Sequence, residues 1–106
     1  MIYTTTETIP GRDIIDIVGI VTGNVVQSKH VGRDIMAGLK SIVGGEIRGY
    51  TEMLNEARDV AIERLVDSAA EKGADAIVGI RFTTSAIMDG CSEIMAFGTA
   101  VKLASQ

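Results

Sequence analysis

The chain of 106 residues has the length of a single domain. Hydrophobic residues make up 46% and charged residues 23%, a balance typical of a globular protein and not of a disordered one. Aromatic residues are only 4%, so the core must be mainly aliphatic. The net charge of −4 argues against general nucleic-acid binding, because phosphate affinity needs clustered positive charge.

The cysteine count, the N-terminal residues and the absence of long apolar runs indicate where in the cell the protein resides. Cys91 is the single cysteine, which excludes an intrachain disulfide and a Cys-x-x-Cys metal site. The N-terminus has neither the basic nor the apolar region of a signal peptide. No apolar run approaches the ~18 residues that span a membrane. We therefore expect a soluble, cytoplasmic protein without membrane contacts.

The N-terminal part of the chain predicts strands. Residues Ile2–Ile9 are compatible with a brief strand that ends at Pro10-Gly11. The stretch Asp13–Gln27 is dense in Ile and Val, which favours a strand over a helix. Gly23-Asn24 interrupts this pattern, and we expect a bulged or bent strand there, with a hairpin turn as the alternative.

Two helices are predicted next. Apolar residues recur at three- and four-residue steps over Val31–Val43, and Gly44-Gly45 would end that helix. A longer helix is expected to begin near Tyr50 or at Thr51, a suitable N-cap, and to end at Lys72-Gly73. Its apolar stripe comprises Met53, Leu54, Ala57, Val60, Ala61, Leu65 and Ala69.

The C-terminal part predicts an antiparallel hairpin whose loop is Met88–Cys91. In its first strand we expect Ala76, Val78, Ile80 and Phe82 on one face and Ile77, Gly79, Arg81 and Thr83 on the other. The order strand, helix, helix, strand, strand predicts an α+β domain with a small curved antiparallel sheet packed against two helices.

The helices would cover one face of this sheet, and the second face would need to be covered as well. Three principal strands leave edges with unpaired backbone groups, and neither face of the last two strands is clearly polar. A partner subunit is the simplest cover, so we expect a homo-oligomer. The alternative is a monomer in which the N-terminal strand and the loops cover that face.

A family resemblance supports assembly. The segments that carry it are 28–54, with its glycine-rich block from Gly38 to Gly49, and 57–58, 73–82 and 96–101. Over nearly the whole chain they resemble the YbjQ-like family of small bacterial and archaeal proteins of unknown function. The resemblance implies a dodecin-subunit-like fold, in which short extra strands help to assemble a pentameric ring. It supplies no catalytic residues.

That family is commonly labelled heavy-metal-binding, but this chain lacks the paired cysteines of heavy-metal-associated domains. Cys91, with Asp89 and Glu93 beside it, is the candidate ligand for a soft divalent metal ion. Ring symmetry could bring several copies of Cys91 together. The alternative is an inert loop thiol.

A second candidate site would bind a small anion. Lys29, His30 and Arg33 fall at the predicted start of the first helix, where amide groups and the helix dipole favour negative charge. The alternative is a solvated helix start in which Asp34 neutralises Arg33. No phosphate-loop pattern is present.

Acidic residues recur every four positions along the second helix, at Asp59, Glu63, Asp67 and Glu71. This acidic ridge could attract cations or a basic partner, or it could be a solvated face whose repulsion is softened by the nearby cations. The softening cations would be Arg58, Arg64 and Lys72.

Arg81 lies within an apolar strand. If its face were buried, it would need a carboxylate from Glu93 or from a neighbouring subunit, and it could also contact a ligand.

His30 is the only histidine and no nucleophile motif accompanies it, so no catalytic constellation is evident. We expect a small-ligand or metal-binding oligomer with sites at subunit junctions. The alternative is a non-catalytic structural or protein-interaction module.

Overall fold

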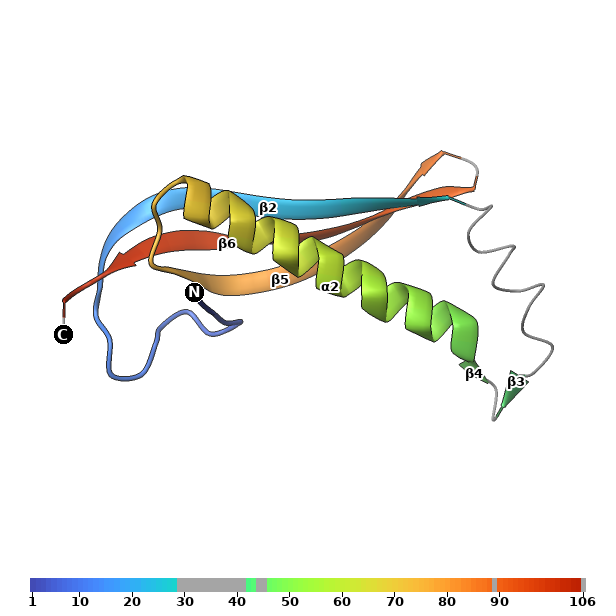
Figure 1. Ribbon diagram of the computed structural model, residues 1–106, viewed down its shortest axis with the longest axis horizontal. Helices are drawn as coiled ribbons and strands as arrows, with labels where there is room; N and C mark the ends of the chain where they lie inside the picture. Colours follow the sequence, from blue (N-terminus) through green and yellow to red (C-terminus); the bar gives the residue numbers. More distant parts are fainter. Residues whose placement is uncertain (29–41, 44–45, 89, 106) are drawn as a thin grey trace.

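The computed structural model describes residues 1–28, 42–43, 46–88 and 90–105 (Figure 1). One long helix, α2 (Arg48–Glu71), lies across one face of a sheet, which confirms the α+β class. The sheet contains β1 (Ile2–Tyr3), β2 (Ile14–Ser28), β5 (Ala76–Met88) and β6 (Cys91–Leu103). A separate short pair consists of β3 (Ile42–Val43) and β4 (Glu46–Ile47).

The four-stranded sheet has the order β1-β5-β6-β2. The central strand β6 is antiparallel to both β2 and β5, so the predicted C-terminal hairpin is confirmed. The short β1 instead runs parallel to β5, pairing Ile2 with Ala76 and Tyr3 with Ile77. The sheet is therefore mixed, and the prediction of a purely antiparallel sheet was wrong. The local pattern of β1 could not reveal the direction of so distant a pairing.

Strand β2 is continuous through Gly23 and Asn24, which pair with Ala96 and Met95 of β6. An irregular strand was expected, but its irregularities lie earlier, next to Ile14 and before Gly19. Gly19 has a φ of 149°, a conformation that residues with side chains rarely adopt. The distortion therefore falls at this glycine and not at Gly23, and the hairpin alternative is excluded.

A bulge in β5 overturns the predicted alternation. The register shifts between Val78 and Arg81, and Gly79 adopts a left-handed φ of 65°. Because of this extra residue, Ile77 and Ile80 lie in the same buried cluster beneath α2. Ala76 and Val78 belong to a second cluster on the opposite face.

The N-terminal segment is less regular than predicted: only Ile2–Tyr3 forms a strand, and Ile9 makes an isolated bridge with Arg12. It nevertheless follows the bulge of β5, since Gly79 N donates to Thr6 O at 2.9 Å and Ile80 N to Thr4 O at 3.1 Å. Ile9 is buried in the second cluster. This segment thus covers one end of the face that α2 leaves open.

Helix α2 begins at Arg48, two residues before Tyr50, so Thr51 lies within the helix and the prediction that it is the N-cap was wrong. Most of the predicted stripe is confirmed, because Ala57, Ala61, Leu65 and Ala69 are fully buried. The C-terminus is also as predicted. Gly73 has a φ of 74°, and the Ala74 and Gly73 amides donate to the carbonyls of Ala69 and Ala70, a Schellman ending.

The other predicted helix, Val31–Val43, lies mostly outside the described residues. Its last two residues are described and form β3, in which Ile42 pairs with Ile47 and Val43 with Glu46. That end of the prediction was wrong. β-branched Ile and Val suit a strand as well as an apolar helix position, and a nearby partner strand decides between them. Within the described residues, no helix has the length and apolar character needed to span a membrane.

Candidate functional site

Cys91 is half-buried at the first position of β6, opposite Ser28 of β2 and Met88 of β5. Glu93 follows two residues later, and its Oε2 accepts a hydrogen bond from Asn24 Nδ2 at 3.1 Å. Asp89 lies outside the described residues. In the part of the chain that is described, no three His, Cys, Asp or Glu side chains gather closely enough to hold a metal ion. One chain's described residues therefore do not fit a closed metal site.

Arg81 is exposed and forms hydrogen bonds with the backbone, and its contact with a ligand stays a prediction. Its Nη1 donates to Thr5 O at 2.9 Å and to Ile80 O at 2.8 Å, so it fastens the N-terminal segment to the sheet. Glu93 pairs across the hairpin with Ser85, farther along β5, and the hypothesis of an Arg81–Glu93 pair was wrong. Since Arg81 is exposed, it does not require a buried carboxylate.

The predicted anion-binding residues Lys29, His30 and Arg33 lie outside the described residues. Their role stays a prediction that rests on their position in the sequence.

The sheet face opposite α2 exposes large apolar side chains. Ile17 and Ile20 are 68% and 75% exposed, and Val26 is 57% exposed. Ile20 directly precedes the buried Val21, which packs beneath α2, so the two side chains point to opposite faces. We call Ile17, Ile20 and Val26 the apolar row of β2.

Both lateral edges of the sheet are open over long stretches. Among the described strands, β2 pairs along one side only, with β6. On the other side β1 pairs with Ala76 and Ile77 and leaves the outer edge of β5 from Arg81 onward without a strand partner in the described part of the chain. Such edges present rows of backbone donors and acceptors to another chain.

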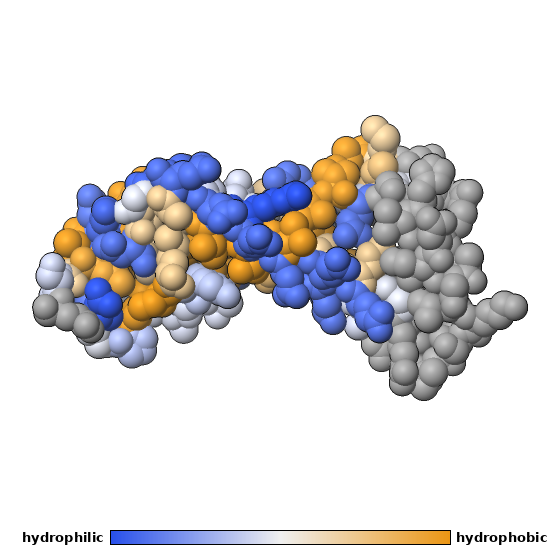
Figure 2. Space-filling model, in the orientation of Figure 1, coloured by the Kyte–Doolittle hydropathy of each residue, from blue (hydrophilic) through white to orange (hydrophobic). Residues whose placement is uncertain are grey.

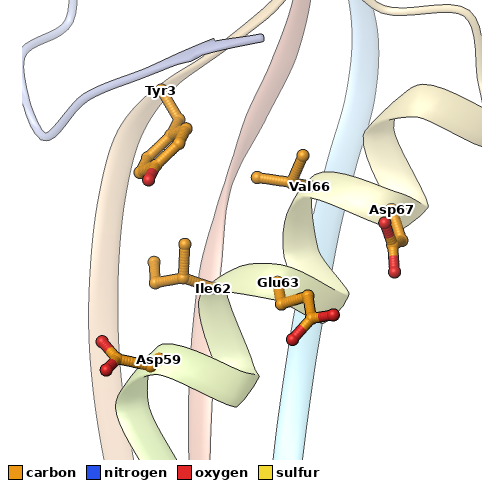
Figure 3. Close-up of a pocket in the computed structure, with 6 residues that line it drawn as sticks. All are labelled: Tyr3, Asp59, Ile62, Glu63, Val66 and Asp67. Atoms are coloured by element: carbon orange, nitrogen blue, oxygen red, sulfur yellow. The ribbon is translucent and has the colours of Figure 1, made fainter. Parts of the chain in front are cut away.

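A pocket lies between β1 and α2 and is lined by Tyr3, Asp59, Ile62, Glu63, Val66 and Asp67 (Figure 3). Its volume is about 560 Å³. Three members of the acidic ridge line it, whereas Tyr3 was not foreseen as a site residue. No local signal marks Tyr3, because the parallel pairing of β1 with β5 brings it to the helix from far away in the sequence.

Of the three cations near the ridge, Arg64 of α2 and Lys72, which follows α2, form hydrogen bonds with β2. Arg64 Nη1 donates to the carbonyl of Asn24 at 2.6 Å, and Lys72 Nζ to the carbonyl of Ile20 at 3.5 Å. Both partners belong to β2, on the far side of the helix from Tyr3. Arg58 Nη1 bonds to Asn55 Oδ1 at 3.3 Å. The hydrogen bonds of Arg64 and Lys72 thus lead away from the pocket, whereas Asn55, the partner of Arg58, lies one helical turn before Asp59 on the same side of the helix.

Comparison with known proteins places the chain in a family. A family model named YbjQ, described as "Putative heavy-metal-binding", matches residues 1–104. The chain belongs to the YbjQ family. Similar sequences bear the name UPF0145 protein. One from Shewanella frigidimarina is 91% identical over 103 residues, covering 97% of this chain and 96% of the relative. One from Thermotoga maritima is 58% identical, with 97% of each chain covered.

The YbjQ fold also has a counterpart among solved structures. A protein of unknown function from Pediococcus pentosaceus, assigned to the DUF74 family, superimposes with a TM-score of 0.61. The two chains are 19% identical, and 98% of each is covered. At this identity the likeness concerns the fold alone.

Proposed function

We propose that this YbjQ-family chain assembles into a homo-oligomeric ring, a pentamer by family resemblance, that binds a small ligand or a metal at subunit junctions and does no catalysis. The apolar row of β2 on an open-edged strand carries this proposal. Ile and Val side chains at 57–75% exposure that share one face of a strand are better explained by a covering chain than by contact with water.

The positions of the two open edges favour a ring. The outer edge of β2 and the outer edge of β5 are different surfaces at opposite sides of the sheet. When one copy offers β2 and the next offers β5, the contact is heterologous. Such contacts repeat from copy to copy and close into a ring when the rotation permits. A second copy is therefore the occupant that we assign to these edges.

We place ligand binding at the junctions because one chain by itself supplies too few soft ligands for a metal ion. Soft metal ions prefer several thiolate or imidazole ligands, and a single chain supplies one cysteine. A metal would need Cys91 from more than one copy. A small anion would bind to Lys29, His30 and Arg33. The cytoplasmic location of the protein stays a prediction.

Native mass spectrometry of untagged protein, purified without chelator, tests the assembly. We expect a five-subunit mass, and we expect Ile20→Lys to shift the population to monomers because it places a charge in the covered row. Ala70→Lys adds the same charge at an exposed position on α2 and should leave the oligomer intact. A monomeric wild-type protein, or equal dissociation by both variants, would contradict the proposal.

A further inference from the structure

The pocket between β1 and α2 has an apolar wall that the fold leaves uncovered. Helix α2 packs mainly against β2 and β6 and less against β5, so it leaves β1, at the edge of the sheet beyond β5, uncovered. Tyr3 lies on the same face of the sheet as α2, since its register partner Ile77 is buried beneath the helix. Tyr3 is 52% exposed, and Figure 3 shows its ring across from Ile62 and Val66.

The charged rim of the pocket has one sign. Asp59, Glu63 and Asp67 follow one another at four-residue steps, which places them about 6 Å apart along the helix axis. Figure 3 shows Asp59 on the side of the helix where Tyr3 lies, while Glu63 and Asp67, on the next two turns, extend to the other side. In Figure 2 hydrophilic residues form a diagonal band with hydrophobic atoms on both sides. Like charges at this spacing repel, and the hydrogen bonds that Arg64 and Lys72 donate go to carbonyls of β2.

These two properties define a ligand chemistry. An apolar wall beside a row of carboxylates complements a molecule in which alkyl segments alternate with ammonium groups. The aromatic face of Tyr3 adds attraction for a cation. A bare metal ion would leave the apolar wall without a contact, and the described residues include no cluster suited to one. An anion would meet only repulsion.

We propose that this pocket binds a small linear organic polycation of the polyamine class. The alkyl segments would lie against Tyr3, Ile62 and Val66. The ammonium groups would meet the carboxylates of Asp59, Glu63 and Asp67, the three acids that line the pocket. The volume of about 560 Å³ is large enough for a molecule of this class. The site lies within one chain and differs from the subunit junctions, so this inference goes beyond the proposed function.

Isothermal titration calorimetry with spermidine, at low and at physiological salt, tests the proposal on the full chain. In NMR spectra of the same sample, the chemical-shift changes caused by spermidine should occur at Tyr3 and along residues 59–67. We expect Asp59→Asn/Glu63→Gln/Asp67→Asn to weaken spermidine binding by about tenfold or more, as the sum of three exposed charge contacts. Tyr3→Ala, which changes no charge, should weaken it by a smaller factor while the melting temperature stays close to that of the wild type.

The matched control is Glu52→Gln/Glu56→Gln/Glu71→Gln, which removes the same charge from α2 outside the pocket lining. It should leave spermidine binding almost unchanged. Equal weakening by the two triple variants, or no effect of Tyr3→Ala, would mean that only the general field of the helix attracts the cation and would overturn the proposal. Absence of binding to the wild-type chain, as expected if a second copy fills the pocket, would overturn it as well.

Discussion

Gly23 of β2 lies directly beneath the carbonyl of Ala61 in α2, and no space for a methyl group remains between them. A Cβ at Gly23 would overlap the Ala61 oxygen and the Leu65 nitrogen, and it would lie 3.0 Å from the Arg64 carbonyl carbon. Small residues on both elements let the backbones approach closely. This contact places α2 over β2 and β6 and so leaves room for the pocket beside Tyr3.

We predict that Gly23→Ala destabilises the protein by about 1–3 kcal/mol, because the new methyl group must push the helix backbone away from the sheet. Urea denaturation at a fixed protein concentration measures this loss. Thr22→Ala, at the exposed neighbouring position, should change stability by less than about 0.5 kcal/mol. If Gly23→Ala lowers the stability as little as Thr22→Ala does, α2 does not pack on β2 as closely as we describe.

Gly79 permits a test of the bulge in β5. Its φ of 65° is disfavoured for Ala, while a Cβ there would meet no atom within 4 Å. Gly79→Ala should therefore cost about 1–2 kcal/mol from backbone conformation alone. Gly79→Asn should cost less, because Asn tolerates the left-handed region better. Thermal melts of the two variants can be compared directly, and the opposite order would argue against a left-handed Gly79.

Leu65 is among the largest fully buried side chains and packs in the cluster between α2 and the sheet. We expect Leu65→Ala to lower the free energy of unfolding by about 2–5 kcal/mol through lost burial and the cavity left behind. Leu54 lies nearer the helix start and is only half-buried, so Leu54→Ala should cost less. Similar losses in both variants would show that the core is not centred on Leu65.

If the ring uses Cys91 for a soft metal, Cys91→Ser should abolish stoichiometric binding, because thiolate is the soft ligand that the chain supplies. Cd²⁺ titration followed by native mass spectrometry counts the ions bound per oligomer. Ser92→Ala, at the next position, should bind as the wild type does. Undiminished uptake by Cys91→Ser would remove the cysteine from the hypothesis.

Much of the secondary structure follows from local chemistry. The buried stripe of α2, with Ala61 and Leu65 at its centre, was predictable because helical periodicity brings residues four apart onto one side. The Gly73 ending was predictable because glycine enters the left-handed conformation without strain. The α+β class and the C-terminal hairpin followed from the same kind of local pattern.

The other features of the fold depend on pairing between residues that lie far apart in the sequence. The parallel pairing of β1, the bulge at Gly79 and the exposure of Arg81 depend on how the N-terminal segment meets β5, residues more than seventy positions away. The acidic ridge was evident as a spacing of four, but its meeting with Tyr3 was not. Local periodicity determines which residues share a side of a helix or strand, whereas only the packed chain determines which sides face each other. For this protein the sequence alone determined the C-terminal hairpin, the long helix and the buried stripe of that helix, because these depend on local periodicity. The tertiary structure decided which residues line the pocket and which edges stay open, because these depend on contacts between distant parts of the chain.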